Sequence, residues 1–296
     1  MKILLVFLFL CQLALADEKQ IPFPHIFTKF PQTSGRAARK AFHKDALPYW
    51  GILAATTGIL YHYDEKISSN IRYHATNWDV SPHYRTHNTL EMHGNLLNMP
   101  RDLGSMLYFS GDGFIHIAAA GTFIGAGKIV GNNYSVNTGI MMIHGMTMTG
   151  IYAQLLKRSF GRESPVEKTQ PRGAWHPFPS FHQYQSNTAK YDAMPSGHIM
   201  TATLTFTILA NRYEKYQAPI MGLGAVWIGS LAFQMVNNGV HWASDYPLGI
   251  AMGYLIGKSV IEMNSEKKDA VTKDGDRWII YPGISGGPSL HAMKFF

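Results

Sequence analysis

The sequence predicts an all-α protein built as a bundle of about six core helices. Long apolar segments recur along the chain, without the strict alternation of apolar and polar residues that is typical of half-buried strands. These segments are rich in alanine, glycine and methionine, and most are too long for the strands of a sandwich. Charged residues make up only 15% of the 296 residues, so the chain can bury a large core.

The N-terminus has the pattern of a secretory signal. Lys2 precedes an apolar run, and the ALA sequence at residues 14–16 fits a small-residue cleavage site, so we expect residues 1–16 to be removed on export. A short membrane anchor is the alternative. The one cysteine, Cys11, lies in this segment, so the mature chain would have neither a disulfide nor a thiol nucleophile.

The rest of the chain divides into three parts. Residues 17–102 are a polar, basic and histidine-rich lead-in with one short apolar helix at 46–61, which we expect to lie against the bundle or the membrane surface. Residues 103–263 form the helical core, and residues 264–296 form a polar tail with glycine- and proline-rich turns. The apolar segments of the core are 114–126, 138–156, 199–211, 216–239 and 246–257.

Two of these segments, 138–156 and 216–239, approach or exceed the ~20 residues that a membrane-spanning helix needs. The mean hydropathy of −0.08 is low for a chain with many spans. We favour a bundle embedded in a membrane, and a soluble exported bundle stays open. With an exported N-terminus, six spans would put the loop at 157–198 in the cytoplasm, whereas omission of 46–61 would put it outside.

The most informative stretch is YDAMPSGH at residues 191–198. Pro195 suits the first position of a helix, so Ser196 and Gly197 are expected in its first turn. Free N–H groups and the positive end of the helix dipole bind anions there, and glycine allows close approach to the backbone. His198 would lie beside the anion and could donate a proton. An ordinary turn and helix start is the alternative.

A second pair, His241 and Asp245, lies in NGVHWASD at residues 238–245. Residues four apart share one face of a helix. A carboxylate beside one imidazole nitrogen fixes the tautomer and leaves the other nitrogen as a base or nucleophile. Such a pair alone is usually a local hydrogen bond, but its occurrence together with PSGH, across an apolar helix, indicates a phosphate site.

These motifs resemble those of the type 2 phosphatidic acid phosphatase superfamily, which includes the bacterial class A acid phosphatases and the vanadium haloperoxidases. The family pattern is K-x6-R-P, then PSGH, then S-R-x5-H-x3-D. PSGH matches in full, the third motif matches at His241 and Asp245, and the first matches at Lys157 and Pro165. The resemblance covers roughly residues 100–258.

The resemblance implies hydrolysis of a phosphate ester in two steps. His241, oriented by Asp245, attacks phosphorus and forms a phosphohistidine, while His198 protonates the leaving oxygen. Water then hydrolyses the intermediate. The family needs no metal or cofactor for this hydrolysis. The resemblance also implies a set of phosphate-binding residues: Lys157, Ser196 and Gly197.

Two phosphate-binding arginines of the family are replaced in this chain. One falls on Ser164 and the other on Met235. The loss of one donor to developing charge costs roughly 2.7–4 kcal/mol, so two independent losses would severely weaken catalysis. Arg162, two residues before Ser164, is the expected substitute at the first motif and is predicted to bind phosphate. No local replacement for the second is visible.

Other polar residues have structural interpretations. His83, His87 and Glu91 recur every four residues and could ligate a divalent metal on one helix face, but we favour a polar, partly exposed helix and predict no metal site. Asp112 is expected to cap the helix that follows it. His144, within an uncharged run, is expected to be packed and hydrogen-bonded.

We therefore expect a phosphatase for a lipid phosphate or pyrophosphate, in a bacterial inner membrane with its site facing the periplasm. The alternatives are a soluble periplasmic acid phosphatase of broad specificity and a catalytically weakened bundle that binds a phosphate headgroup. The net charge of +7 suits phosphate esters or an anionic bilayer. No run of five or more basic residues occurs, which argues against nucleic acid as a partner.

Overall fold

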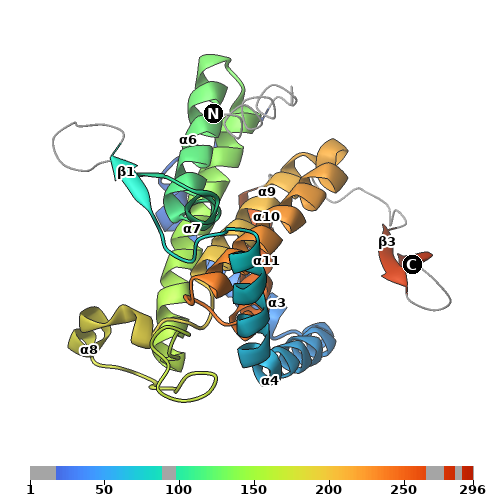
Figure 1. Cartoon of the computed structure of the whole chain (residues 1–296). Coiled ribbons are helices and arrows are strands. Elements are labelled where there is room, and N and C mark those ends of the chain that lie inside the picture. Colours follow the sequence, from blue (N-terminus) through green and yellow to red (C-terminus); the bar gives the residue numbers. More distant parts are fainter. Residues whose placement is uncertain (1–17, 89–97, 265–276, 284–288, 296) are drawn as a thin grey trace. The chain divides into compact units, whose positions relative to one another are not determined.

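This computed structural model describes residues 18–88, 98–264, 277–283 and 289–295 (Figure 1). The chain divides into two units, Met1–Asn264 and Ser265–Phe296. The expected signal segment, residues 1–16 with Cys11, lies outside the described residues.

The first unit is helical, so the predicted all-α class is confirmed (Figure 1). Its helices are α2 (His25–Thr28), α3 (Phe30–Ala41), α4 (Leu47–Asn77), α5 (Leu103–Phe109), α6 (Gly113–Ile129), α7 (Asn133–Phe160), α8 (Phe181–Ser186), α9 (Gly197–Arg212), α10 (Gln217–Asn237) and α11 (Tyr246–Asn264). Short 3-10 turns join them at η1 (Lys44–Ala46), η2 (Thr188–Lys190), η3 (Glu214–Tyr216) and η4 (Ala243–Asp245). Six of the helices, α4, α6, α7, α9, α10 and α11, are long and match the expected number.

Two antiparallel strand pairs accompany the helices. β1 (Thr86–Asn88) pairs with β2 (Asn98–Pro100) in the first unit. The second unit contains β3 (Arg277–Gly283) paired with β4 (Ser289–Phe295). The sequence predicts only turns in this tail. Aromatic and β-branched residues at 278–281 (WIIY) explain the difference, because they favour extended backbone.

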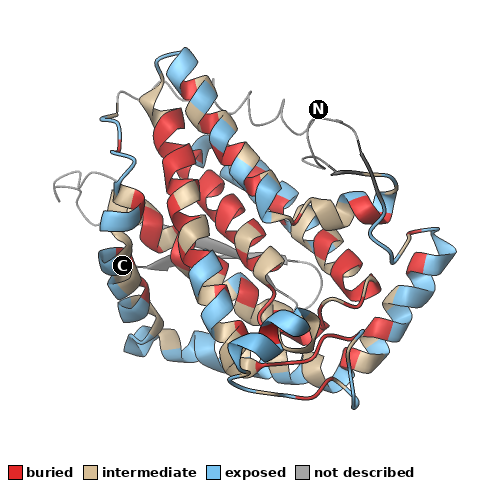
Figure 2. Cartoon of the chain, turned by 90° about the vertical axis from the view of Figure 1, so that its left-hand side faces the viewer, coloured by how far each residue is buried: buried red, intermediate tan, exposed pale blue. Residues whose placement is uncertain are grey.

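Helix α9 lies at the centre of the bundle and contacts α6, α7, α10 and α11. Twelve of its sixteen residues are buried. Buried residues, drawn in red, lie on the inner sides of the helices in Figure 2. Three glycines of α11, at positions 249, 253 and 257, face α9 one turn apart. A Cβ on Gly249 would lie 2.9 Å from the Ser196 carbonyl oxygen, so small residues set the close approach of the two backbones.

The apolar segment predicted at 46–61 is the first half of α4, which runs to Asn77 and is much longer than expected. Residues 62–77 contain neither glycine nor proline, so nothing in them ends the helix. Helix α4 packs against α10, α11 and η4. It therefore joins one end of the bundle to the segment that contains His241 and Asp245.

Apolar side chains cover part of the outer surface. The exposed large apolar residues include Leu47, Trp50, Ile52 and Ile59 on α4, and Met221, Leu223 and Val226 on α10. Among the described residues, one helical stretch, Glu214–Asn237, is long and apolar enough to cross a membrane, and only a third of its most apolar window is buried. The other predicted span, 138–156, lies within α7, much of which is buried.

Candidate active site

The two histidines of the sequence motifs lie side by side. The ring centroids of His198 and His241 are 6.0 Å apart, and the ring planes cross at 71°. His198 is in the first turn of α9, and His241 lies between α10 and η4. Tyr108 of α5 lies next to the His198 ring at 5.5 Å, and Tyr246 lies next to the His241 ring at 6.4 Å. Tyr108 could not be predicted as a site residue, because no motif in the sequence around it marks it.

Helix α9 begins at Gly197, with Ser196 as its N-cap residue. Pro195 therefore precedes the helix rather than opening it, since the buried Ser196 hydroxyl is the cap and accepts from the Ile199 N–H at 3.5 Å. The N–H groups of the first turn lack intrahelical partners. The anion site that PSGH predicts would lie at these N–H groups.

Lys157 reaches this turn from the last turn of α7. A Cβ built on Gly197 would lie 3.9 Å from Lys157 Cε, so the lysine stem passes directly beside the glycine. Its Nζ lies 3.2 Å from Asp192 Oδ2, and the two side chains are 9% and 22% exposed. A phosphate at the turn would share the lysine with this carboxylate.

A backbone carbonyl fixes the tautomer of His241. Nδ1 donates to the Ala193 carbonyl oxygen at 2.6 Å, whereas Asp245 Oδ2 is 3.7 Å away. A proton on Nδ1 leaves a lone pair on Nε2. Within the described part of the chain, the buried His241 Nε2 and the buried His198 Nδ1 have no hydrogen-bond partner. Two unpaired ring nitrogens in adjacent rings mark a place for a polar ligand.

His241 and Asp245 do not share a helix face, contrary to the expectation from their spacing. Gly239 has φ = 73° and ends α10, and only residues 243–245 form a 3-10 turn. The N–H groups of Val240 and His241 both donate to the Met235 carbonyl oxygen, at 3.0 and 3.3 Å. The chain therefore turns sharply before His241 and folds Asp245 back beneath it.

Arg162 does not reach the phosphate turn, and this corrects its assignment as a phosphate ligand. The side chain is fully buried, with Nη1 at 2.6 Å from Asp245 Oδ1 and Nη2 at 2.8 Å from Asp64 Oδ2. Nη2 also donates to the Arg172 carbonyl oxygen at 2.9 Å. Two buried carboxylates hold the guanidinium, because a buried charge without a partner would be costly.

Asp64 of α4 completes this network. Its carboxylate accepts from the Ser244 N–H at 3.1 Å and from the Ser244 hydroxyl at 2.5 Å. Asp64 thus fixes η4, which carries Asp245. The sequence offers one signal for Asp64, which is its position as a charged residue one helical turn after the apolar segment 46–61. Because its partners lie about 100 and 180 positions away, its role could not be read from sequence.

The charge of Arg162 controls Asp245. Burial alone would raise the pKa of this carboxyl group, but the guanidinium and the neighbouring His241 ring outweigh burial, so the pKa lies below its ordinary value. Asp245 therefore stays ionised, and its Oδ2 also accepts from the Trp242 N–H at 2.7 Å.

Glu163, next to Arg162, anchors the loop that follows α7. Its carboxylate accepts from the backbone N–H groups of Thr169 and Ala174, each at 2.8 Å, and contacts His176 Nε2 at 3.0 Å. Burial raises the pKa of Glu163, but these hydrogen bonds outweigh it and lower the pKa to about 2.

The two positions of the missing arginines differ. Ser164 is buried, and its hydroxyl has no hydrogen-bond partner among the described residues. Met235 is fully buried in an apolar cluster with Ile199 and Leu231. Apolar packing between α9 and α10 therefore occupies the second position. Lys157 is the one motif cation that lies beside the anion-binding turn.

The remaining polar residues have structural placements. Asp112 caps α6, where its Oδ1 accepts from the Phe114 N–H at 3.0 Å. His144 is buried, and its Nδ1 lies 3.3 Å from Asn264 Nδ2. His83 and His87 do not share a helix, since residues 86–88 form β1. Glu91 lies outside the described residues, and the described ones contain no group of three or more His, Cys, Asp or Glu that could hold a metal ion.

Residues 139–269 match the family model of the PAP2 superfamily. This range holds the lysine, PSGH and H-x3-D motifs. One similar solved structure is the crystal structure of the first transmembrane PAP2 type phosphatidylglycerolphosphate phosphatase from Bacillus subtilis, with 17% sequence identity and a TM-score of 0.48. That match covers 84% of this chain and 100% of the other. No curated protein matches the chain.

Proposed function

Because residues 139–269 match the family model of the PAP2 superfamily, we propose that this chain is a phosphatase that hydrolyses a phosphate monoester or pyrophosphate of a lipid through a phosphohistidine. The observation that carries this proposal is the pair of adjacent rings, 6.0 Å apart, whose nitrogens His241 Nε2 and His198 Nδ1 have no described partner. Lys157 and the first turn of α9 lie beside them. A phosphoryl group that touched both rings would meet a nucleophile, an acid and hydrogen-bond donors at once.

In the first step, the lone pair of His241 Nε2 forms a bond to phosphorus as the bond from phosphorus to the leaving oxygen breaks. This step requires a protonated His198, which the negative charge of the bound phosphoryl group favours, and His198 gives its proton to that oxygen. In the second step, neutral His198 takes a proton from water, whose oxygen bonds to phosphorus as the P–N bond breaks. Phosphate leaves, His241 is neutral again and His198 is protonated again. The carbonyl of Ala193 holds the His241 tautomer throughout.

The phosphoryl charge is stabilised by the Lys157 ammonium, the Gly197 N–H and the dipole of α9. Two arginines of the family are absent from this set, because Ser164 and Met235 occupy their positions. We therefore expect slow turnover. The same feature favours one second candidate, a bundle that binds a phosphate headgroup without hydrolysing it.

We also propose that the bundle is embedded in a membrane with the catalytic end outside. The first 17 residues of α4, 47–63, carry no charge and have exposed apolar side chains. At 1.5 Å per residue they extend ~25 Å, close to the ~30 Å of a hydrocarbon core. Helix α11 runs beside α4, with the Asp245 end at the site and Glu262 near its other end.

Residues 18–46, the first part of the lead-in, lie at the end of the bundle away from the site. Arg36 and Lys40 pair with Glu262 of α11, and Glu18 pairs with Arg212 at the end of α9. Residues 18–46 hold six Lys or Arg and two acidic residues, which favours the cytoplasmic face. This arrangement requires the alternative to a cleaved signal, in which residues 1–16 stay attached as a short membrane anchor. Cleavage after Ala16 would export the lead-in segment instead, and the N-terminal sequence of the purified protein distinguishes the two.

The test of function is phosphate release by the purified full chain from phosphatidate and from an isoprenyl pyrophosphate. We expect turnover that falls at least ~10⁴-fold in His241→Ala. Retained turnover in that variant contradicts the mechanism. Tight phosphate binding without turnover of any ester would favour the headgroup-binding alternative. Activity recovered in the soluble fraction without detergent would favour the soluble acid phosphatase.

A further inference from the structure

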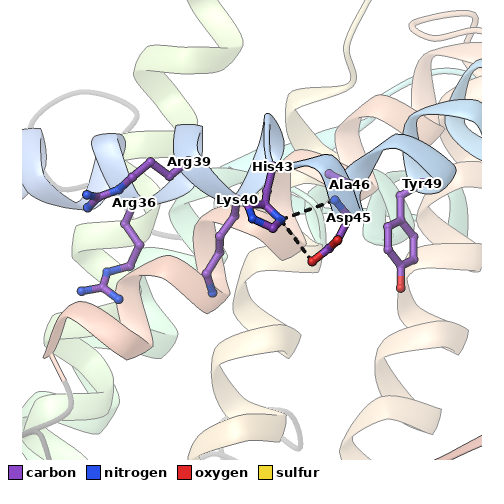
Figure 3. Close-up of a pocket in the computed structure, with 7 residues that line it drawn as sticks. All are labelled: Arg36, Arg39, Lys40, His43, Asp45, Ala46 and Tyr49. Carbon is purple, nitrogen blue, oxygen red and sulfur yellow. Dashed lines mark hydrogen bonds and ion pairs between the residues drawn. The ribbon is translucent and has the colours of Figure 1, made fainter. Parts of the chain in front are cut away.

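A basic hollow lies at the corner between α3 and α4 (Figure 3). This corner lies near Glu262 at the end of α11, away from the active site. Its volume is about 510 Å³. The side chains that line it include Arg36, Arg39, Lys40, His43, Asp45 and Tyr49. We propose that this corner binds the phosphate headgroup of an anionic phospholipid in the leaflet opposite the active site. The inference rests on the proposed membrane embedding of the bundle, and not on its catalytic activity.

The positive charges of the hollow are only partly neutralised. Arg36 and Lys40 share one carboxylate, Glu262, and His43 pairs with Asp45 at 3.1 Å. Arg39 is exposed and has no hydrogen bond or ion pair with any described residue. Arg36 Nε is buried and lacks a hydrogen-bond partner in the described part of the chain. A headgroup phosphate supplies the acceptors that these two guanidinium groups lack.

Aromatic and apolar side chains surround the cations. Phe42 is 81% exposed and stacks on Trp50, with the ring centroids 6.2 Å apart and an interplanar angle of 16°. Trp50 Nε1 donates to the Ala41 carbonyl oxygen at 2.6 Å, which fixes the stacked pair at the corner. Leu47 and Tyr49 are 68% and 72% exposed. Exposed aromatic residues beside Lys and Arg are typical of the membrane–water interface.

A bilayer fits both the cations of the hollow and the apolar face of α4 beside it. From the corner towards the active site, α4 presents Ile52 and Ile59, which are 63% and 60% exposed, and no charge occurs before Asp64. An acyl chain can lie along this apolar face while its headgroup meets Arg39. A soluble anion would use the cations but would leave the apolar face uncovered. We therefore assign the hollow to a lipid headgroup rather than to free phosphate.

The test uses the full chain purified in detergent, with equimolar phosphatidylglycerol and phosphatidylcholine added, and native mass spectrometry of the bound lipid. Wild type should retain phosphatidylglycerol in preference to phosphatidylcholine, and 10-fold excess inorganic phosphate should not displace it. Each cation near an anionic lipid contributes about 1 kcal/mol, so Arg39→Gln should lower this preference about fivefold. Lys44→Gln removes an equal charge at the same corner outside the hollow and should change it less than twofold.

Equal retention of the two lipids by wild type would overturn the proposal, and so would an unchanged preference in Arg39→Gln. Displacement by inorganic phosphate would show that the hollow takes a free anion instead of a headgroup. Phosphate release is measured in parallel and should be the same in Arg39→Gln and wild type. A wild type without turnover that still prefers phosphatidylglycerol would contradict the proposed function and leave this inference standing.

Discussion

Substitution of Arg162 by methionine should destabilise the protein through two carboxylates at once. Arg162 makes ion pairs of 2.6 and 2.8 Å with Asp245 and Asp64, and all three side chains are fully buried. Removal of one member of a buried ion pair costs about 3–5 kcal/mol, because the charge left behind is uncompensated. Since one cation serves two carboxylates, we expect Arg162→Met at the upper end of this range.

The loss of stability in Arg162→Met should be larger at pH 8 than at pH 5. In wild type the pKa of Asp245 lies below its ordinary value, so its contribution to stability is fully present from pH 5 to pH 8 and is lost only in more acidic solution. Without the guanidinium, burial is the dominant effect and raises the pKa. A buried carboxyl group with a raised pKa destabilises the folded protein as the pH rises, because it must then either ionise without a partner or hold its proton against solution. The variant should therefore be closer to wild type at pH 5 than at pH 8.

The assay is denaturant unfolding of the full chain in one detergent at both pH values, and circular dichroism monitors the loss of helix. Arg158→Met is the matched control, because Arg158 contacts Gln154 and the Tyr184 ring near the surface, and its loss should change stability by no more than about 0.5 kcal/mol. If Arg162→Met unfolded like wild type but bound phosphate at least tenfold more weakly, Arg162 would be a phosphate ligand and the reasoning would be refuted.

Three further predictions concern residues around the site. Asp64→Asn should lower kcat about tenfold or more with KM nearly unchanged, because Asp64 holds η4 and does not touch substrate, whereas Glu65→Gln, at a partly exposed neighbour that pairs with Lys168, should behave like wild type in the same assay. Gly253→Leu should destabilise the fold by about 1–3 kcal/mol in urea, since any side chain there meets the Met200 carbonyl oxygen; unchanged stability would disprove the close contact of α9 and α11. The pKa of Glu163 is lowered to about 2, so its contribution is present above its ordinary pKa and fades as the pH falls towards 2; Glu163→Gln should thus cost more at pH 7 than at pH 3, and an equal cost at both would contradict this.

Much of the helical core could be predicted because apolar composition and motif spacing are local properties. The segments 199–211 and 246–257 lie within α9 and α11. Helix α4 was underestimated because its polar second half shows no apolar run, although it contacts η4 by tertiary packing. Tertiary contacts routinely override such local signals.

The site was partly predictable for the same reason. PSGH and H-x3-D indicate which residues to bring together, and His198 and His241 do lie side by side. The role of Arg162 could not be predicted, since the choice between a phosphate ligand and a buried counter-ion depends on Asp64, 98 residues away. The orienting carbonyl of Ala193 was equally hidden, because backbone groups carry no sequence signature.

The central claim of the mechanism is a covalent intermediate at His241. Incubation of the wild-type full chain with ³²P-labelled phosphatidate, followed by a rapid alkaline quench, should trap an acid-labile label on His241. The same experiment on His241→Asn should give no label. A label on any other residue, or undiminished phosphate release by His241→Asn, would contradict nucleophilic attack by this imidazole.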